Sequence, residues 1–369
     1  MAKVVYIISD IQKAVFFEHT AIRLRDSGID LSFILINCDK SELGTFLQSN
    51  GFKTHYLQVG KLLASWRQII ACTRILRAEK PQAVHCHLSA ANFVGLISSF
   101  LARVRIRVYT RHAGKPLTYS LKGSLIDHIQ NRLATRIVAI TQNTKELLLS
   151  EGVPKRKITI IHHGFDIERM MHPDLDEVSR ISQRYNPRHQ FPMVGVIARW
   201  MKWKGIQYII PAFSRLLQDQ PDAKLVLFNA SDGADYSREL NDMLLALPPD
   251  SYQVVKTFEK NIYDLFHLFD IYVHVPVDPW CEAFGQTYVE ALAQGVPSIF
   301  TLSGIAREFI TEDSAYIVDF QNSDQIYENM KAILAKQKDH DKLIKNGQEV
   351  VLKMFSLEKY ISTLLSIYK

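Results

Sequence analysis

Short apolar runs alternate with longer segments of helical period along the whole chain. In the first half, the apolar runs predict strands at 3–9, 31–37, 54–59, 83–87, 105–111, 136–141 and 157–162. Apolar residues at helical spacing predict helices between them, near 16–27, 41–49, 61–79, 89–102, 119–134 and 143–151. This alternation favours a parallel sheet that is covered by helices on both faces.

The alternation breaks between Phe165 and Gln190, where Pro173, Pro187 and charges of both signs interrupt it. It restarts with strands predicted near 193–199, 224–229, 252–258, 271–275, 298–302 and 315–319, and with helices near 206–219, 237–247, 261–269, 284–294 and 323–336. The segment from Ser356 to Tyr368 again has a helical period. We therefore predict an α/β protein with two Rossmann-like parallel-sheet domains, which face each other across a ligand-binding cleft.

Composition adds a compartment to this picture. At 369 residues, the chain is long enough for two domains that each bury their own core. The four cysteines show no C-x-x-C spacing and indicate free thiols in a reducing compartment. A strand predicted at the N-terminus leaves no room for a signal peptide, and the uncharged run Leu88–Ala102 is too short to span a membrane. We expect a soluble, cytoplasmic protein.

The formal net charge of +6 is distributed unevenly. Residues 1–165 contain 23 Lys+Arg and 10 Asp+Glu, a balance of +13, whereas residues 166–369 contain 21 and 28, a balance of −7. A strongly basic half indicates an anionic partner, such as a membrane surface, an acidic glycan or nucleic acid. Scattered, solvated surface charge is the alternative interpretation.

The most informative stretch is Glu282–Pro297, with the sequence EAFGQTYVEALAQGVP, which follows the strand predicted at 271–275. A helix is predicted from about Phe284 to Gln294, because Gly295 and Pro297 stop it in the usual order. Glu282 is expected at the loop-to-helix junction and Glu290 two turns inside the helix. At this spacing of eight residues, both carboxylates can point along one face into the same crevice. The unpaired N–H groups of a first helical turn suit a phosphate. A carboxylate that binds hydroxyl groups, next to a helix start that binds an anion, is the combination that a sugar–diphosphate ligand needs.

This stretch resembles the retaining GT-B glycosyltransferases of the GT4 type, which have Phe-Gly after the first Glu and Glu-Ala-Leu-Ala-x-Gly-x-Pro at the second. The resemblance implies that Glu282 faces the donor sugar and that Glu290 holds the nucleotide ribose. The backbone amides of Phe284, Gly285 and Gln286 would meet the sugar and phosphate. It also implies the GT-B organisation, with an acceptor-side domain 1–165, a linker 166–190, a donor domain 191–352 and a C-terminal helix 353–369 that returns to the first domain.

Arg199 and Lys204 lie in the segment Arg-Trp-Met-Lys-Trp-Lys-Gly, which follows the first strand of the second half. It resembles the family's Arg-x4-Lys-Gly motif, whose cations bind the donor diphosphate. Fixed cations stabilise the negative charge that develops as the diphosphate departs. A solvated basic turn is the alternative. Two weaker matches to the family are Asn229–Gly233 and the pair Ser303-Gly304 with Glu308.

The first half carries looser signals. Thr110-Arg111-His112 resembles the family's Thr-x-His, which makes His112 a candidate catalytic residue near sugar and acceptor, although histidines at strand ends are also structural. His162–Asp166 resembles the family's Asn-Gly-Val-Asp turn. His85 and His87 share a strand face as metal ligands do, but no third ligand lies nearby, so no metal site is predicted.

One segment departs from the family, which usually has Gly-Gly after the first strand. Here Asp10, Ile11, Gln12 and Lys13 follow that strand. Either the loop is reshaped for another acceptor, or the N-terminal side of the donor site is weak.

Together these residues predict a retaining hexosyltransferase-like enzyme of cell-envelope polysaccharide synthesis. It would move a sugar from a UDP- or GDP-sugar to a glycan or lipid-linked acceptor, without metal or other cofactor and without nucleic acid. The basic half adds a possible peripheral position at the inner face of an anionic membrane. A sugar-nucleotide epimerase on the same fold and a non-catalytic nucleotide-sugar-binding protein are the alternatives.

Overall fold

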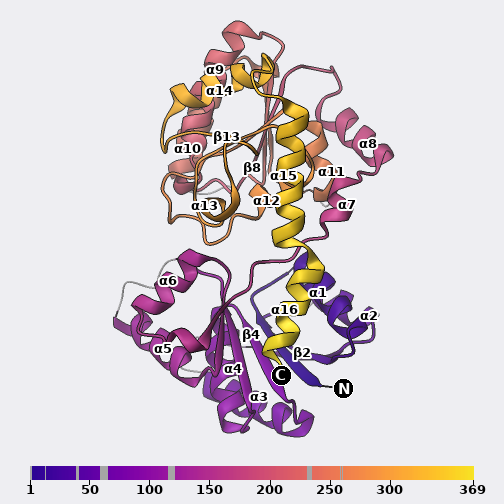
Figure 1. The fold of residues 1–369 in the computed structure, drawn as a ribbon, viewed down its shortest axis with the longest axis vertical. Helices are drawn as coiled ribbons and strands as arrows, with labels where there is room; N and C mark the ends of the chain where they lie inside the picture. The colour runs from indigo at the N-terminus through magenta and orange to yellow at the C-terminus, as the bar shows by residue number, and fades with distance from the viewer. Residues whose placement is uncertain are drawn as a thin grey trace. The chain divides into compact units, whose positions relative to one another are not determined.

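The computed structural model describes residues 2–12, 14–38, 41–58, 65–114, 121–230, 235–257, 259 and 261–369. They form two compact units, each built on its own parallel sheet (Figure 1). Unit 1 consists of Met1–Phe165 and Leu357–Lys369, and unit 2 consists of Asp166–Ser356. The prediction of an α/β protein with two Rossmann-like parallel sheets is confirmed, and each predicted strand has a counterpart in the structure.

Unit 1 is organised by a seven-stranded parallel sheet. In spatial order its strands are β3 (Lys53–Leu57), β2 (Asp30–Ile36), β1 (Lys3–Ser9), β4 (Ala83–His87), β5 (Ile106–Arg111), β6 (Arg136–Ala139) and β7 (Ile158–Ile160). The strand order reverses between β1 and β4, and ligands of such sheets bind beyond the carboxyl ends of the strands at this point.

Helices cover both faces of this sheet because its strands are apolar on both sides. They are α1 (Val15–Asp26), α2 (Glu42–Ser49), α3 (Ser65–Glu79), α4 (Ser89–Leu101), α5 (Leu121–Leu133) and α6 (Gln142–Ser150), with a short 3-10 turn, η2 (Lys155–Lys157). One core lies under α1 and α2 and includes Tyr6 and Phe33. The other lies under α3, α4 and α6 and includes Ile7 and Tyr109.

The end of the chain belongs to unit 1. Helix α16 (Leu357–Ile367) buries Tyr360 and Leu364 in the core under α1. Its start is joined to the end of the first segment, because the Leu357 N–H donates to the Phe165 carbonyl at 3.0 Å. Residues 353–355, expected within this helix, instead end α15 (His340–Phe355) of unit 2.

Unit 2 contains a six-stranded parallel sheet. Its spatial order is β10 (Tyr252–Val255), β9 (Lys224–Phe228), β8 (Met193–Ile197), β11 (Ile271–His274), β12 (Ser298–Phe300) and β13 (Tyr316–Ile317), so the order reverses between β8 and β11. The remaining elements are α7 (Ile167–Met171), α8 (Leu175–Tyr185), η3 (Lys202–Lys204), α9 (Ile206–Asp219), α10 (Asp235–Leu245), η4 (Pro249–Ser251), α11 (Ile262–Leu265), η5 (Phe266–Leu268), α12 (Gln286–Ala293), α13 (Ala306–Phe309), α14 (Ser323–Leu334) and α15.

Residues 166–190 differ from the predicted linker, because they form α7 and α8 within unit 2. Asp166 and Asp174 cap these helices by accepting hydrogen bonds from the backbone N–H groups of Arg169 and of Asp176 and Glu177. A proline before a helix and side-chain caps at its start are compatible with regular structure, so Pro173 interrupts the pattern without making the segment a flexible linker.

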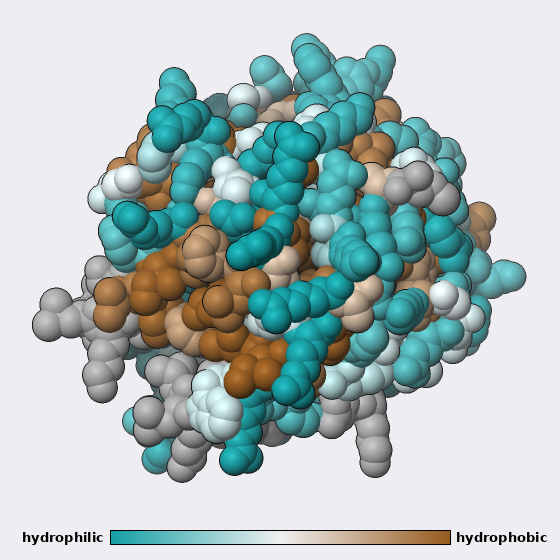
Figure 2. Space-filling view, turned by 90° about the horizontal axis from the view of Figure 1, so that it is seen from below, coloured by the Kyte–Doolittle hydropathy of each residue, from teal (hydrophilic) through white to brown (hydrophobic). Residues whose placement is uncertain are grey.

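Within the described ranges, no helix is long and apolar enough to cross a membrane. The surface nevertheless has an apolar area on one side. Figure 2 is seen from below, the side on which α3 and α4 lie in Figure 1, and shows hydrophobic side chains gathered between hydrophilic ones.

Candidate active site

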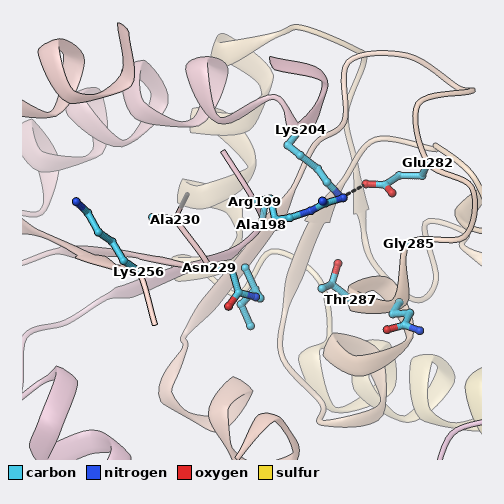
Figure 3. Close-up of a pocket in the computed structure, with 11 residues that line it drawn as sticks. Ala198, Arg199, Lys204, Asn229, Ala230, Lys256, Glu282, Gly285 and Thr287 are labelled. Carbon is cyan, nitrogen blue, oxygen red and sulfur yellow. Dashed lines mark hydrogen bonds and ion pairs between the residues drawn. The ribbon is translucent and has the colours of Figure 1, made fainter. Parts of the chain in front are cut away.

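A pocket of about 770 Å³ opens in unit 2 at the carboxyl ends of β8, β9 and β10 and at the start of α12 (Figure 3). Its lining residues are Ile197, Ala198, Arg199, Lys204, Asn229, Ala230, Lys256, Glu282, Gly285, Gln286 and Thr287. This set includes five predicted site residues. Phe284 and Glu290 belong to the same unit but do not line the pocket. Its volume is in the range of small-molecule sites.

Glu282 is the buried carboxylate of this pocket, with 8% of its surface exposed. Its Oε1 pairs with the Lys204 ammonium and lies 3.3 Å from Nε2 of His274, the last residue of β11. Burial alone would raise the pKa of this carboxyl, but His274 and Lys204 together lower it to about 2. Glu282 is therefore ionised at neutral pH and held in place by two neighbours.

The loop that carries Glu282 is fixed by the segment after β12. The Glu282 N–H donates to the Ser303 hydroxyl at 3.2 Å, and the Ile305 N–H donates to the Phe284 carbonyl at 3.0 Å. Gly304 lies between these contacts with φ at 57°. A Cβ at Gly304 would come within 2.8 Å of both the Glu282 Cβ and the Phe284 carbonyl oxygen. The Ser-Gly pair found in the sequence thus supports the position of the carboxylate.

The two predicted phosphate ligands differ in their surroundings. Arg199 lies just beyond β8 and is exposed, and no described residue forms an ion pair or hydrogen bond with its guanidinium. Lys204 ends the turn η3 and contacts Glu282. Gly205, with φ at 77°, lets this turn approach β11, because a Cβ there would lie 1.9 Å from the Val275 carbonyl oxygen. Within the described part of the chain, the Arg199 guanidinium therefore has no partner, whereas the Lys204 ammonium is paired with Glu282.

Helix α12 begins at Gln286, later than the predicted start at Phe284, because Gly285 adopts a left-handed φ of 87° and is the N-cap. Glu282 thus lies in the loop just before the helix, close to the predicted loop-to-helix junction. Glu290 does not line the pocket that Glu282 lines, so the predicted shared crevice is not seen for the two carboxylates. No described side chain caps the helix. Among the described residues, none accepts from the N–H groups of Gln286 and Thr287, which leaves these donors for an anion.

Glu290 lies in the second turn of α12 and is partly exposed. No described residue donates a hydrogen bond to its carboxyl, and burial raises its pKa to about 7. It is therefore a group whose charge changes close to neutral pH. A ligand that donates hydrogen bonds to the carboxylate would favour its ionised form.

His112 belongs to unit 1, where it follows β5 within a group of histidines at the carboxyl ends of the strands. Its Nε2 lies 3.3 Å from Nδ1 of His87, and its ring stacks on that of His163 with centroids 5.5 Å apart. Burial lowers the pKa of His112 to about 4, and it lowers the pKa values of His87 and His163 as well. These rings are neutral at pH 7.

A hydrogen-bonded chain lies behind this histidine cluster. His85 contacts the Tyr368 hydroxyl at 2.6 Å and the Thr110 hydroxyl at 2.8 Å, and the hydroxyls of Tyr368 and Tyr6 are 2.6 Å apart. The rings of His85 and His87 do share one face, with centroids 4.2 Å apart. Across the residues described, however, no three His, Cys, Asp or Glu side chains are arranged to hold a metal ion.

The loop after β1 has, at Asp10, a backbone conformation that favours glycine, although this chain lacks the family's Gly-Gly there. Asp10 has a left-handed φ of 55°, which glycine adopts most easily and Asp adopts at modest cost. Its carboxylate accepts from Asn37 Nδ2 at 2.9 Å, and its N–H donates to the Ile36 carbonyl at 3.0 Å. Lys13 of the same segment lies outside the described residues.

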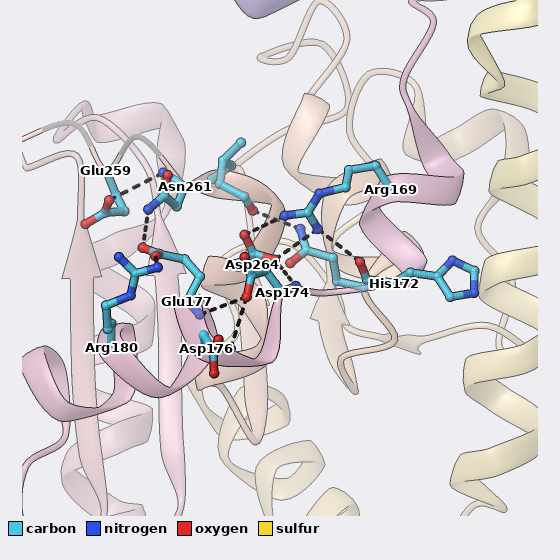
Figure 4. Close-up of polar contacts among 11 residues, drawn as sticks. Arg169, His172, Asp174, Asp176, Glu177, Arg180, Glu259, Asn261 and Asp264 are labelled. Atoms are coloured by element: carbon cyan, nitrogen blue, oxygen red, sulfur yellow. Dashed lines mark hydrogen bonds and ion pairs between the residues drawn. The ribbon is translucent and has the colours of Figure 1, made fainter.

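A second group of charged side chains in unit 2 does not line the pocket (Figure 4). Arg169 donates to both oxygens of Asp264 at 3.0 and 2.9 Å, and Asp264 also accepts from the Asp174 N–H at 2.8 Å. Asn261 donates to Glu177. These contacts attach α7 and α8 to α11, so we assign them a structural role.

Several lining residues were not singled out from the sequence. Lys256 and Thr287 line the pocket and are ordinary residues near strand or helix ends. His274 does not line the pocket but supports Glu282 from within the buried strand β11. A polar residue in an otherwise apolar strand was the signal for His274. Of the weak Asn229–Gly233 match, Asn229 lines the pocket and has φ at 61°, while residues 231–233 lie outside the described part of the chain.

Sequence families match both halves of the chain. Residues 177–350 match the family described as Glycosyl transferases group 1, and residues 14–169 match Glycosyltransferase Family 4. A similar protein is the capsular polysaccharide biosynthesis glycosyltransferase CapM of Staphylococcus aureus, 23% identical over 83% of this chain and 81% of that protein. Another is a GDP-mannose-dependent alpha-mannosyltransferase of Mycobacterium tuberculosis, 26% identical over 64% of this chain and 60% of that protein.

A solved structure has the same fold over nearly the whole length. Anabaena Alr3699/HepE, determined in complex with UDP, superposes with a TM-score of 0.82 and covers 99% of both chains at 20% sequence identity.

Proposed function

Because this chain belongs to the GT4-type glycosyltransferases, we propose that it transfers a sugar from a UDP- or GDP-sugar to a glycan or lipid-linked acceptor, with retention of the anomeric configuration. The carboxylate of Glu282, clamped between Lys204 and His274 beside the uncapped start of α12, carries this proposal. A carboxylate that can accept hydrogen bonds from sugar hydroxyls therefore lies beside N–H groups that can donate to a phosphate. A sugar joined to a diphosphate requires both kinds of group. The UDP bound to Alr3699/HepE supports a nucleotide donor.

In this proposal Arg199 and Lys204 bind the diphosphate. The guanidinium of Arg199 has no partner among the described residues, so an incoming phosphate need not displace one. Arginine can engage two phosphate oxygens, whereas lysine acts as a point charge. The N–H groups of Gln286 and Thr287 add neutral donors at the positive end of α12. The interactions of all these groups with the diphosphate become stronger as the leaving diphosphate gains negative charge.

Glu282 would accept hydrogen bonds from the donor sugar. Its contact with Lys204 suggests an exchange, in which the diphosphate becomes a second partner for the ammonium and leaves the carboxylate to the sugar hydroxyls. His274 keeps the carboxylate oriented throughout, because its ring lies 3.3 Å away and is fully packed in β11. As positive charge grows at the anomeric carbon, a fixed carboxylate nearby stabilises it.

Glu290 would accept hydrogen bonds from the ribose hydroxyls, since its carboxyl has no donor among the described residues. His112 is proposed to contact the sugar and acceptor as a neutral ring. In this proposal, neither Glu290 nor His112 forms a covalent bond with the substrate.

The bond changes follow a front-face displacement. The bond from the anomeric carbon to the phosphate oxygen breaks, and its electron pair stays on the departing nucleoside diphosphate. The acceptor hydroxyl adds to the same face, and its proton passes to a departing phosphate oxygen. We include no metal ion, because Arg199 and Lys204 supply the positive charge; a chelator such as EDTA is therefore expected to leave turnover unchanged.

We further propose that the enzyme works at the inner face of a cell membrane as a peripheral protein in cell-envelope polysaccharide synthesis. The excess of 23 Lys+Arg over 10 Asp+Glu in residues 1–165 favours an anionic surface. The four cysteines are free thiols, which fits a reducing compartment. Nucleic acid is not a proposed partner.

A thermal-shift panel of UDP, GDP, ADP and their sugars tests the donor, followed by product analysis with and without acceptor. We expect one nucleotide to raise the melting temperature and sugar transfer to require an acceptor. A changed sugar configuration in the free nucleotide-sugar, formed without acceptor, would instead indicate an epimerase. Binding without any turnover across acceptors would indicate a non-catalytic binding protein.

A further inference from the structure

Large hydrophobic side chains are exposed on three neighbouring helices of unit 1 (Figure 2). Trp66 and Ile70 on α3 are 57% and 42% exposed, and Leu125 on α5 is 59% exposed. At the end of α4, Phe100 and Leu101 are 53% and 46% exposed. We call these five residues the helical face.

The members of the helical face lie on helices that contact one another. The Ser98 hydroxyl in the last turn of α4 donates to the Ile69 carbonyl in α3 at 3.1 Å. The Arg77 guanidinium of α3 donates to the Leu101 carbonyl at 3.1 Å. Helix α4 also contacts α5. The exposed side chains therefore share one surface and are not scattered over the unit.

The charges around the helical face have one sign. Residues 65–136 contain twelve Lys+Arg and only two Asp+Glu, Glu79 and Asp127. Both acids are buried and already paired: Glu79 lies 2.5 Å from the ammonium groups of Lys3 and Lys53, and Asp127 lies 2.6 Å from Arg111. The exposed charges that this segment contributes are therefore positive; those described as exposed are Arg67, Arg74, Arg77, Lys80, Arg103, Arg105 and Arg132.

Cations and apolar groups are also combined locally. The guanidinium of Arg107 lies over the Phe100 ring, 5.7 Å from its centroid, and that of Arg67 lies over Trp66 at 5.3 Å. An aromatic ring with a cation over its face suits the boundary between lipid headgroups and acyl chains, because the ring is apolar while the guanidinium can stay hydrated.

We propose that the helical face docks on an anionic lipid bilayer, with Trp66, Ile70, Phe100, Leu101 and Leu125 entering the interface and the surrounding arginines binding lipid phosphates. Aliphatic side chains would gain nothing from a nucleic-acid backbone, but they gain from contact with acyl chains. A second copy of the chain would bring like charges together. The proposal deepens the membrane position in the proposed function and does not depend on the sugar or nucleotide.

Co-sedimentation with lipid vesicles tests this surface directly. The full-length protein is mixed with vesicles of phosphatidylcholine alone and with vesicles that also contain phosphatidylglycerol, over a series of salt concentrations. We expect binding only to the anionic vesicles, falling as salt screens the charge. Phe100→Ser with Leu101→Ser should lower the partition coefficient about tenfold or more. Arg74→Ala with Arg103→Ala should lower it by a similar factor, since each basic group contributes roughly fivefold.

Matched controls lie on unit 2. Leu245→Ser and Leu175→Ser remove side chains that are 73% and 75% exposed, and Lys345→Ala removes an exposed charge. These variants should bind vesicles like the wild type, and the melting temperature of every variant is measured to check that it is folded.

Equal loss of binding in both sets of variants, or equal binding to neutral vesicles, would overturn the proposal. Concentration-dependent dimerisation lost in the Phe100 and Leu101 variant would assign the surface to a second copy. Nucleotide binding and transfer to a soluble acceptor should persist in these variants, so the two proposals fail separately.

Discussion

The pocket of unit 2 and the histidine cluster of unit 1 occupy the same kind of position, at the carboxyl ends of parallel strands, but differ in electrostatics. The pocket contains groups that are charged at neutral pH, with the pKa of Glu282 lowered to about 2 by His274 and Lys204 against the opposing effect of burial. Burial keeps the histidines of the cluster and His85 behind it neutral, with the pKa of His85 lowered to about 3 and that of His112 to about 4.

This difference indicates a division of chemical roles. Permanent charges suit a diphosphate and a cationic transition state, because both interact strongly with fixed ions. Neutral imidazoles suit hydroxyl groups, to which they can donate or from which they can accept a hydrogen bond without the cost of a buried charge. We therefore expect substitutions that remove a charge in unit 2 to have the largest effects on activity. In unit 1, the histidines should show themselves in how the free energy of unfolding depends on pH.

The largest effect is expected from Glu282→Gln. The change keeps the shape of the side chain but removes the negative charge that stabilises the positive charge developing at the anomeric carbon. The loss should be on the order of 2–4 kcal/mol, or roughly thirty- to a thousandfold in kcat. Steady-state kinetics with saturating acceptor measure it, and Glu312→Gln on the exposed surface of unit 2 is a matched control. A normal kcat for Glu282→Gln would remove this carboxylate from the chemistry.

The next effect is expected from the joint change of Arg199 and Lys204 to Ala. Nucleoside diphosphate binding should weaken by about a hundredfold or more, because two charge-assisted contacts are lost, whereas the bare nucleoside should bind almost as before. Isothermal titration of both ligands gives the two factors. Arg199→Ala alone is the cleaner companion experiment, because Lys204→Ala also leaves His274 as the one described side chain in contact with the Glu282 carboxylate. Equal losses for both ligands would show that the cations do not bind phosphate.

A moderate effect is expected from acid on the stability of unit 1. The folded-state pKa values of His85 and His112, about 3 and about 4, lie below the ordinary value of 6.5. The unfolded chain therefore binds protons first as pH falls below about 6.5, and the free energy of unfolding decreases by about 1.4 kcal/mol per pH unit for each such histidine. Urea unfolding between pH 7 and pH 5 measures the slope, which His85→Gln should reduce. An unchanged slope in that variant would mean that His85 titrates normally.

The smallest effect is expected from Glu290→Gln. Hydrogen bonds to a ribose are alike in the ground and transition states, so the donor KM should rise about three- to tenfold while kcat stays the same. The pKa of Glu290, raised by burial to about 7, adds a second readout. Donor affinity of the wild type should improve as pH rises through 7, when the carboxylate forms, and the variant should lack this dependence. A selective fall in kcat would instead place Glu290 at the reacting sugar.

The fold followed from the hydrophobic pattern, because apolar runs mark each strand of both sheets. The elements that were missed depend on tertiary contacts. Helix α15 contains Gly347, which weakens a helix locally, yet a Cβ there would lie 3.2 Å from Leu292, so the glycine lets α15 pack against α12. In the same way, α7 and α8 owe their place to the contacts of Arg169 and Asp174 with Asp264, which sequence spacing does not reveal.

The candidate site could be predicted where a residue carries its own signal. Arg199, Lys204 and Glu282 stand out by type and spacing, and all three line one pocket. The start of α12 at Gln286 could not be predicted, because it depends on the left-handed backbone of Gly285 and on the contacts of the segment around Gly304 with Glu282 and Phe284. His274 was overlooked because a histidine inside a buried strand is most often structural, and its role depends on a contact with a residue from another loop.

One measurement tests the central claim most directly: nuclear magnetic resonance of the reaction with the identified nucleotide-sugar, recorded with and without acceptor. The account predicts that a new glycosidic signal appears only with acceptor, has the anomeric configuration of the donor, and forms at least thirtyfold more slowly with Glu282→Gln. A product of inverted configuration would contradict the front-face displacement. Transfer at the wild-type rate by Glu282→Gln would contradict the assignment of the reaction to this pocket.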